Sequence, residues 1–275
     1  MPNPLYINWN VNPDAFTIGP FHIRYYGLMF IAAFAIGTYL FWLIIKRENK
    51  PKILAMQLLN VVFLSVFIGA RLGDCLFYYP EYYLKHPWQI FFPFANGEFI
   101  GYQGLSSHGG AIGLLIGLYI FSRSTKTPYL WILDRLVIVV AMAGFFIRIG
   151  NLMNSEIYGT ITDIPWAFIF IQKDETLPRH PTQIYEALAY LLIFFTLGWL
   201  YLKKIEKLVP GMLLSLFLLL TFSARFFIEY LKAPLTAREN DLVLNTGQLL
   251  SLPFIFTGAF MLLTLVMRGG LSKST

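Results

Sequence analysis

The sequence has little charge and almost no cysteine. Only 13% of its 275 residues are charged, whereas soluble domains carry about 25%. So few charged side chains cannot cover a soluble globule of this size, which excludes that class of protein along with disordered and collagen-like chains. The single cysteine, Cys75, cannot form an internal disulfide. The chain is therefore not a disulfide scaffold, and its cysteine content says nothing about redox compartment.

Several chemical signatures are absent as well. The sequence has no His-x3-His, CxxC or carboxylate run that would indicate a metal site, and no G-x-S-x-G nucleophile elbow. The net charge is +6, but no run of aromatic residues interleaved with Lys and Arg indicates a nucleic-acid surface. We therefore expect no metal and no nucleic-acid partner.

Long apolar segments dominate the sequence instead. Hydrophobic residues make up 57% of the chain, and the mean hydropathy is +0.60. A transmembrane helix needs about 20 mostly apolar residues. Seven stretches approach this length: 25–46, 54–76, 108–122, 129–150, 182–202, 210–231 and 245–267. We expect an all-α integral membrane protein with seven transmembrane helices, of which the third is short and glycine-rich.

Lys and Arg residues between these stretches predict the orientation, because positive charge accumulates on the cytoplasmic side of a membrane. Eleven of them follow the first, third, fifth and seventh stretches, whereas six are spread over the longer segments on the other side. We therefore expect the amino terminus outside and the carboxy terminus inside, which an odd number of spans requires.

The segments outside the expected helices predict how the chain is organised. The first 18 residues contain no Lys or Arg, so they do not resemble a cleavable signal. We expect residues 1–24 to form an aromatic arm at the membrane interface, residues 25–267 the seven-helix domain, and residues 268–275 a cytoplasmic tail. Two long outer segments, 77–107 and 151–181, are rich in aromatic residues, proline and glycine, and long loops commonly have functional roles.

Seven ionisable residues are expected near the outer ends of five helices: Arg71, Asp74, His108, Arg148, Glu186, Arg225 and Glu229. Charged groups inside a membrane are costly and usually mark function. Three arginines at one depth favour an anion, because the guanidinium group binds phosphate through two parallel hydrogen bonds. At this depth the commonest phosphate belongs to an outer-leaflet lipid.

Structural roles for the same residues remain open. Arg225 and Glu229 are four residues apart, so they share a helix face. Arg71 and Asp74, three apart, do the same. Each pair could be an ion pair that joins helices. Arg148 has no acidic partner within a turn of its own helix, and it could extend to the membrane surface.

A glycine-rich segment, residues 101–113, leads into the third expected helix. Gly109 and Gly110 behind His108 would let the backbone approach a ligand closely, and a helix amino terminus would offer N–H groups to an anion. Tight helix packing through small residues also explains the glycines, and His108 alone could be a helix cap.

Two further segments place polar side chains at helix ends. Residues 148–159 contain Asn151, Asn154 and Glu156, a density of hydrogen-bonding groups that helix termination alone hardly explains. A second segment, which leads into the fifth expected helix, ends on Glu186. Both segments are expected on the outer side.

These motifs together resemble one family, the bacterial prolipoprotein diacylglyceryl transferases. Any one motif is modest evidence, whereas the ordered set, which covers nearly the whole chain, is highly specific. The matching segments are 26–28, 108–113, 148–159, 179–186, 225–229 and 247–253. The chain departs from the family at Ile147 and Ser155, where glycine is common, and at Leu152, where phenylalanine is usual.

The resemblance implies an enzyme of the bacterial cytoplasmic membrane with its active site toward the outer leaflet. Such an enzyme transfers the diacylglyceryl group of phosphatidylglycerol to the lipobox cysteine of a prolipoprotein and releases glycerol phosphate, the first step of lipoprotein maturation. Its expected partners are phosphatidylglycerol, lipobox segments and membrane lipids.

The reaction that the resemblance implies needs no metal or organic cofactor, and it indicates roles for the polar residues. A free thiol has a pKa of about 8.5, so a base or a positive field assists it. His108 is our candidate base, with His180 as the fallback, and Arg148 and Arg225 would stabilise the leaving phosphate. The expected substrate-binding residues are Tyr26, Arg71, Gly109, Gly110, Asn151, Asn154, Glu156, Gly159, Glu186 and Glu229.

Functions from two other classes remain as alternatives. An anion or lipid transporter or flippase could use the same arginines, but it would need a polar path to the inner side, where Asp134 and Arg135 alone lie within the spans. The other is a non-catalytic lipid-binding or assembly factor. Release of glycerol phosphate distinguishes the enzyme from both.

Overall fold

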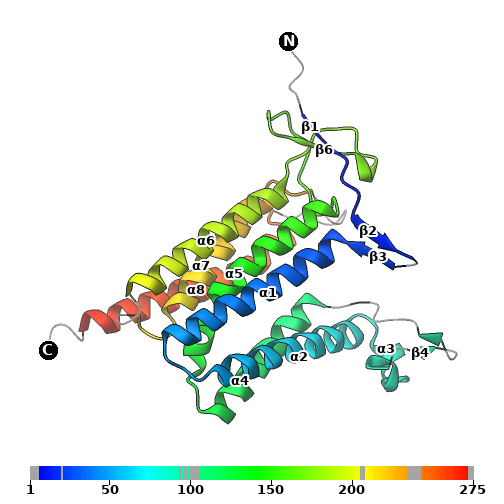
Figure 1. The fold of residues 1–275 in the computed structure, drawn as a ribbon. Coiled ribbons are helices and arrows are strands. Elements are labelled where there is room, and N and C mark those ends of the chain that lie inside the picture. The colour runs from blue at the N-terminus through cyan, green and yellow to red at the C-terminus, as the bar shows by residue number, and fades with distance from the viewer. Residues whose placement is uncertain are drawn as a thin grey trace. The chain divides into compact units, whose positions relative to one another are not determined.

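The computed structural model describes residues 6–19, 21–92, 94–95, 98–99, 104, 106–204, 208–233 and 243–271. Most of these residues are helical (Figure 1). Some predictions concern residues outside these ranges: the start of the arm, most of 101–105, the basic residues Lys207 and Arg238, and the end of the tail with Lys273.

Six helices are long and apolar enough to cross a membrane. They are α1 (Tyr25–Arg47), α2 (Lys52–Phe77), α5 (Tyr129–Met153), α6 (Thr182–Lys204), α7 (Met212–Glu229) and α8 (Thr246–Leu271). The third expected stretch is also helical, as α4 (Ser107–Thr125), but it is not among these six. A mostly helical, multi-pass membrane protein is thereby confirmed, while the seventh span and the orientation stay predictions.

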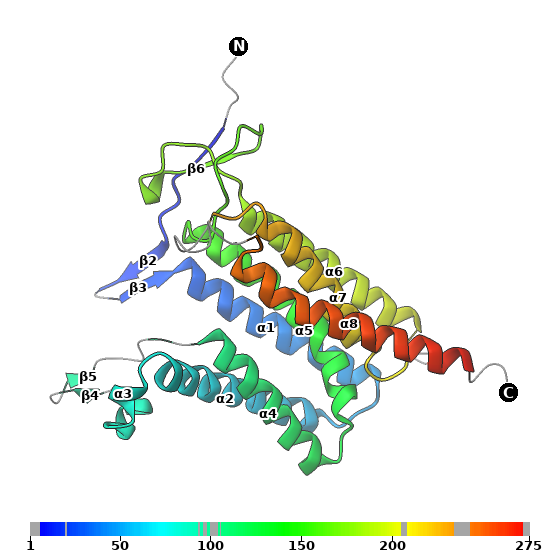
Figure 2. The same cartoon turned by 180° about the vertical axis from the view of Figure 1, so that it is seen from behind.

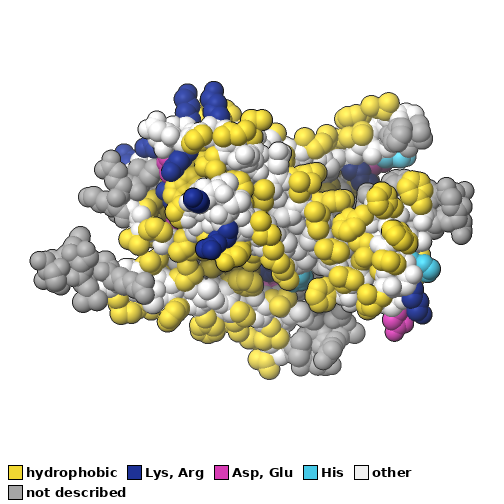
Figure 3. Space-filling view, turned by 90° about the horizontal axis from the view of Figure 1, so that it is seen from below, with side chains coloured by type: hydrophobic (Ala, Val, Ile, Leu, Met, Phe, Trp, Pro, Cys, Tyr) yellow, Lys and Arg dark blue, Asp and Glu magenta, His cyan; other side chains and the backbone are white. Residues whose placement is uncertain are grey.

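Large apolar side chains are exposed along the long helices. Leu192 in α6 and Phe260 in α8 are 68% and 70% exposed, and hydrophobic side chains cover much of the face shown in Figure 3. Soluble proteins rarely expose apolar surface so extensively. Contact with lipid acyl chains accounts for it.

The chain forms two compact units, Phe41–Ile132 and a larger one that joins Met1–Leu40 to Leu133–Thr275. In the smaller unit α2 packs closely against α4. A Cβ atom added at Gly109 of α4 would overlap the backbone of α2 at Gly69 and Gly73, and one added at Gly113 would overlap it at Ser65 and Gly69. Small residues let membrane helices approach this closely, so helix packing accounts for Gly109, one of the predicted substrate-binding residues.

This close contact makes a testable prediction. We expect Gly113→Ala to lower the free energy of unfolding by about 1–3 kcal/mol, because its methyl group would overlap the Ser65 carbonyl oxygen and Gly69. Gly198→Ala in α6 is the matched control, since a Cβ there meets nothing within 4 Å and alanine favours a helix over glycine by about 1 kcal/mol. Thermal unfolding in detergent measures both variants. A melting temperature of Gly113→Ala equal to that of wild type would contradict the close α2–α4 contact.

In the larger unit α7 packs against both α6 and α8, and the three helices lie side by side in both views (Figures 1 and 2). Asp134 of α5 accepts hydrogen bonds from the backbone N–H groups of Gly211 (2.7 Å) and Leu214 (2.8 Å). These groups start α7 and have no partner within the helix. The buried Asp134 carboxylate therefore has a structural role, which weakens the case for a polar transport path on the inner side.

Short strands precede α1 and lie in the segments after α2 and α5, and the sequence did not predict them. Each strand has only two to five residues, too few to show an alternating pattern. The expected all-α fold is thus corrected to a mostly helical one. β1 (Ile7–Trp9) pairs in parallel with β6 (Phe168–Phe170), β2 (Asp14–Ile18) pairs with β3 (Phe21–Arg24), and β4 (Phe94–Ala95) pairs with β5 (Glu98–Phe99).

Three short helices complete the described elements: α3 (Pro80–Tyr83) and the 3₁₀ helices η1 (Pro87–Ile90) and η2 (Ile171–Lys173).

Strand β1 attaches the amino-terminal arm to the segment after α5. Trp9 packs against the buried side chains of Leu152, Phe168 and Phe170, and its Nε1 donates a hydrogen bond to the Leu152 carbonyl at 3.1 Å. The arm is therefore folded onto the expected outer segment 151–181, and its position at a membrane interface stays a prediction.

Candidate active site

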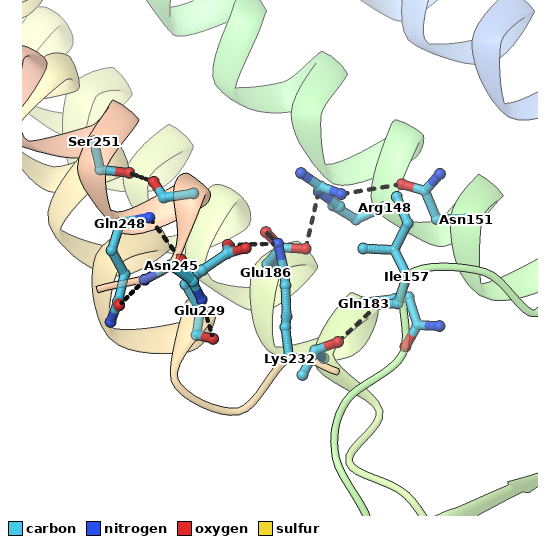
Figure 4. A network of polar contacts seen from close by, with 12 residues as sticks. Arg148, Asn151, Ile157, Gln183, Glu186, Glu229, Lys232, Asn245, Gln248 and Ser251 are labelled. Atoms are coloured by element: carbon cyan, nitrogen blue, oxygen red, sulfur yellow. Dashed lines mark hydrogen bonds and ion pairs between the residues drawn. The ribbon is translucent and has the colours of Figure 1, made fainter. Parts of the chain in front are cut away.

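Four charged side chains form one ionic network in the larger unit (Figure 4). Arg148 Nε of α5 lies 3.2 Å from one carboxylate oxygen of Glu186 in α6, whose other oxygen lies 3.0 Å from Lys232 Nζ. Lys232 also lies 2.9 Å from the carboxylate of Glu229 in α7. Glu186 and Glu229 are only 3% and 8% exposed. Buried charges need such partners, so the network holds both carboxylates in place.

Lys232 is the member of this network that the sequence did not single out. It is one of the six Lys and Arg residues on the expected outer side, and it lies between two buried carboxylates. The one available signal was its position three residues after Glu229, a spacing that suits a contact on a helix face. Nothing local in the sequence indicates its second partner, because Glu186 belongs to another helix.

The position of Lys232 leads to a prediction about stability. Lys232→Met should lower the free energy of unfolding by about 3–5 kcal/mol, because two carboxylates would lose their shared cation in a buried site. Lys232→Arg keeps a cation and should retain most of the stability. Thermal melts of the purified variants at neutral pH measure the difference. Identical melting of Lys232→Met and wild type would contradict the network.

Arg225 of α7 does not use Glu229 as its partner, although their spacing left that pairing open. Glu229 contacts Lys232 instead. Arg225 Nε is buried and has no hydrogen-bond partner among the described residues, and the hydroxyl of Thr221 is in the same state. Both residues line a small cavity with Glu186. A buried donor without a partner is costly, so Arg225 is suited to a ligand that accepts hydrogen bonds.

A chain of side-chain hydrogen bonds joins Arg148 to the segment after α5. Arg148 Nη1 donates to Asn151 Oδ1 at 3.3 Å, and Asn151 Nδ2 donates to Glu156 Oε1 at 2.7 Å. Asn154 Nδ2 donates to the same Glu156 oxygen at 3.4 Å. From the start of α6, Gln183 donates to the Glu156 carbonyl at 2.7 Å. The structure thus brings the predicted residues Asn151, Asn154 and Glu156 together with Arg148.

Two of the three departures from the family pattern have a clear structural setting. Ser155 has a φ of 50°, in the left-handed region that glycine adopts without strain, which explains why glycine suits this position. Leu152 is 5% exposed and packs against Phe168 and Phe170, so an apolar residue is required there. Nothing in the described structure explains Ile147.

The residue just before α8 also supports Glu229. Asn245 Nδ2 donates to the Glu229 carbonyl at 3.1 Å, and Gln248 N donates to Asn245 Oδ1 at 2.8 Å. A Cβ atom at Gly247 would overlap the Glu229 carboxylate. The glycine in the segment 247–253 therefore leaves room for that carboxylate.

Two more predicted substrate-binding residues lie in the larger unit. The ring of Tyr26 packs on Gly150 of α5, where an added Cβ would lie 2.9 Å from the ring. Gly159 pairs with Lys232 through a backbone bridge, and a Cβ there would overlap the Leu231 carbonyl oxygen. Gly159 thus supports the strand-like contact that positions Lys232.

His180, the fallback base, lies just before α6. Its Nδ1 is 3.3 Å from the hydroxyl of Tyr185. Burial lowers the pKa of His180 below its ordinary value of 6.5, so its imidazole is neutral at pH 7, as a base requires. The unfolded chain takes up this proton first as the pH falls, so the neutral His180 contributes stability above about pH 6.5 that is lost in acid.

His108, Gly109 and Gly110 begin α4 in the smaller unit. His108 is exposed on the first turn, and the hydroxyl of Ser106 accepts a hydrogen bond from the Gly109 N–H at 3.3 Å. Ser106, and not His108, is therefore the helix cap. A Cβ at Gly110 would meet Ala70 at an ordinary contact distance of 3.5 Å.

Arg71 is also in the smaller unit and is 1% exposed. It donates hydrogen bonds to the carbonyls of Ile90 (2.7 Å) and Gln89 (3.1 Å) and lies 4.0 Å from Asp74. These contacts hold η1 against α2, in line with the structural alternative. The expected convergence of Arg71 and His108 with the arginines of the larger unit stays a prediction, because it involves both units.

The network and the neighbouring Arg225 together have the charge that an anionic ligand needs. The four network side chains balance as two cations and two carboxylates, and Arg225, which lines a small cavity with Glu186, adds one positive charge. A phosphate ester at this site would meet guanidinium donors that the protein already holds in place, which is the arrangement that stabilises developing negative charge. Within the described ranges, no group of three or more His, Cys, Asp or Glu side chains could hold a metal ion.

Comparison with known proteins agrees with this chemistry. The family described as "Prolipoprotein diacylglyceryl transferase" matches residues 13–264. A phosphatidylglycerol–prolipoprotein diacylglyceryl transferase of Bacteroides fragilis is 41% identical over 93% of this chain and 94% of its own length. Proteins of the same description from Chloroherpeton thalassium and Tolumonas auensis are 41% and 42% identical, over 98% and 93% of this chain and 98% and 96% of their own lengths.

Proposed function

We propose, because this chain belongs to the prolipoprotein diacylglyceryl transferase family, that its ionic network is the site of that family's reaction. The chain is a multi-pass membrane enzyme of bacterial lipoprotein biosynthesis, with phosphatidylglycerol and a prolipoprotein as its substrates. The observation that supports this location best is Arg225, whose Nε is buried and has no protein partner among the described residues.

The bond changes define what the site must do. The thiol sulfur of the lipobox cysteine forms a bond to the glyceryl carbon, and the bond from that carbon to the phosphate oxygen breaks. The thiol proton passes to a base, and the electron pair of the broken bond leaves with glycerol phosphate. The phosphate therefore gains negative charge in the transition state, which donors fixed in advance stabilise.

Arg148 and Arg225 are the proposed partners of that phosphate. Glu186 and Asn151 fix the Arg148 guanidinium through contacts of 3.2 and 3.3 Å, which leaves its remaining N–H groups for the ligand. The opposite charges of Glu229 and Lys232 offset each other. Glu186 thus positions Arg148 without cancelling the net positive charge of the site.

The proposal assigns roles to the remaining predicted residues. His108 accepts the thiol proton, and His180 is the fallback base. Asn151, Asn154 and Glu156 orient the headgroup, and Tyr26 lies beside them. The close contacts of Gly109 and Gly159 with neighbouring backbone favour positioning roles, as do the hydrogen bonds of Arg71 to η1, whereas Gly110 makes only ordinary contacts with α2.

The proposed topology has seven spans, with α4 as the third, an external amino terminus and a cytoplasmic carboxy terminus. The arm 1–24 and the loops 77–107 and 151–181 then lie toward the outer leaflet, and the tail 268–275 lies inside. The excess of Lys and Arg on one side supports this orientation.

Reporter fusions test the topology. A reporter after Thr275 should behave as cytoplasmic, and one inserted in the loop 151–181 should behave as external, because eleven basic residues lie on the first side and six on the second. An external signal from the carboxy-terminal fusion would show that the number of spans or their orientation is wrong.

The activity itself is tested with purified protein in detergent, phosphatidylglycerol and a lipobox peptide. Mass spectrometry of the peptide should show the added mass of one diacylglyceryl group, together with free glycerol phosphate. A protein that binds the lipid but releases no glycerol phosphate would be a transporter or a lipid-binding factor instead.

A further inference from the structure

A polar pocket of about 260 Å³ opens in the larger unit, next to the ionic network. Residues from two separate segments line it: the arm, up to the end of β3, and the loop 151–181. These residues are Asn12, Pro13, Asp14, Arg24, Asn154, Glu156 and Lys173. We propose that this pocket binds the polar stretch of prolipoprotein that follows the lipobox cysteine. The assignment rests on the proposed function, since it concerns the protein substrate of that reaction.

Hydrogen bonds between distant parts of the chain hold the pocket in shape. The Tyr25 N–H donates to the Pro13 carbonyl at 2.9 Å, which fixes the arm against the start of α1. Gln172 Nε2 donates to Asn10 Oδ1 at 2.7 Å, which fixes η2, and with it Lys173, beside the arm. A site that exists before its ligand arrives avoids the cost of ordering its walls.

The charges of the walls favour a peptide over a phosphate. The lining has two acidic residues, Asp14 and Glu156, and two basic ones, Arg24 and Lys173, so the pocket is formally neutral. Arg24 Nε lies 3.6 Å from the Asp14 carboxylate. A phosphate here would lie beside two carboxylates, whereas Arg225 adds a net positive charge next to the ionic network. Every peptide unit has one N–H donor and one carbonyl acceptor, which matches walls that present both signs.

One buried acceptor atom in the pocket wall also lacks a hydrogen-bond donor among the described residues. Asn154 Oδ1 is buried and accepts no hydrogen bond from the described residues. Buried polar atoms normally have a partner, and a backbone N–H of a peptide would supply one. The carboxylates of Asp14 and Glu156 can accept further N–H groups, and Arg24 and Lys173 can donate to carbonyls.

The pocket is connected to the reacting centre by two hydrogen bonds. Glu156 is both a wall of the pocket and the acceptor for Asn151 at 2.7 Å, and Asn151 in turn accepts from Arg148 at 3.3 Å. The segment of a prolipoprotein before its cysteine is apolar and lies among lipids. The segment after the cysteine continues into water, so a polar pocket beside Arg148 fits that side of the substrate.

The size of the pocket fits the same assignment. Pockets for drug-sized ligands start at about 300 Å³, slightly more than this pocket offers. A short peptide segment fits such a space, whereas the diacylglyceryl part of a lipid does not. The acyl chains would stay outside, in the membrane.

Two synthetic peptides test the assignment. Both contain the same lipobox, but one ends at the cysteine as an amide and the other continues with several polar residues. The enzymes compared are wild type, the double variant Arg24→Gln/Lys173→Gln, and Lys85→Gln as the control. Lys85 is an exposed cation outside the pocket. KM is measured separately for each peptide and for phosphatidylglycerol.

We expect the longer peptide to have the lower KM with wild type and with Lys85→Gln. The double variant should raise the KM of the longer peptide about fivefold, because exposed charge contacts each contribute up to about 1 kcal/mol. Fluorescence anisotropy of the labelled peptides gives the same comparison without turnover. An unchanged KM for the longer peptide, or a rise only in the KM for phosphatidylglycerol, would overturn the assignment. Failure of wild type to modify either peptide would overturn the proposed function instead.

Discussion

Arg148→Ala and Arg225→Ala should each lower the rate of diacylglyceryl transfer by a factor of about 10²–10³, and by the same factor at every pH. Both side chains are proposed to face the phosphate, which gains charge as the carbon–oxygen bond breaks. An arginine is protonated throughout the accessible pH range, so no change of pH replaces it. The structural basis is the network of Arg148 and the Nε of Arg225, which has no hydrogen-bond partner among the described residues.

Arg148→Lys separates charge from geometry. Lysine keeps the positive charge but has no planar fork, so it cannot contact Glu186 and Asn151 as the Nε and Nη1 atoms of arginine do. We expect this variant to be impaired as well. Initial rates of purified variants measure the effect, with thermal melting to verify folding and Arg123→Ala, at the exposed end of α4, as the control. Full activity in Arg148→Lys would show that only charge is needed.

His108→Gln should respond to pH in a way that the arginine variants do not. The proposed task of His108 is to take the thiol proton, and solution can do this in part as the pH approaches the pKa of a free thiol, about 8.5. The variant should therefore be strongly impaired near neutral pH and regain part of its rate between about pH 7.5 and 9. His108 is exposed, so the replacement should not disturb the packing of α4.

The measurement is the initial rate against pH for His108→Gln, Arg148→Ala and wild type in parallel. A residual rate of His108→Gln that stays as flat as that of Arg148→Ala would contradict a role as base. In that case His108 binds the headgroup or supports the structure, and the base is His180, Glu156 or water. The lowered pKa of His180 keeps this alternative chemically sound.

The sequence predicted the features that depend on composition and short spacing. Six of the seven apolar stretches are helices long and apolar enough to span a membrane, because about 20 apolar residues in a row have few other structures available. The clustering of Asn151, Asn154 and Glu156 with Arg148 was also predictable, since these residues follow one another at the end of one helix.

Contacts between distant segments were not predictable from spacing. Glu229 pairs with Lys232, and Arg148 pairs with Glu186 from another helix, whereas the sequence could only suggest partners within a turn. The pairing of the arm with residues 168–170 was missed for the same reason. Its strands are too short for periodicity to reveal them.

The glycines show where one pattern permits two interpretations. Near His108 the sequence left open close approach of a ligand or close packing of helices, and the backbone contact between Gly109 and Gly69 supports packing. At Gly247 the glycine makes room for the carboxylate of Glu229. In both cases the cause is a neighbour that only the folded chain supplies.

The central claim is that the phosphate leaves with its bridging oxygen while the arginines stabilise it. Phosphatidylglycerol can be made with a heavy oxygen isotope at the bridging oxygen, which joins the diacylglyceryl carbon to phosphorus. Mass spectrometry of the products then shows which bond was broken. The account predicts that the heavy isotope is found in the released glycerol phosphate and that the peptide thioether has none. Unlabelled glycerol phosphate would show cleavage on the phosphorus side and would contradict the account.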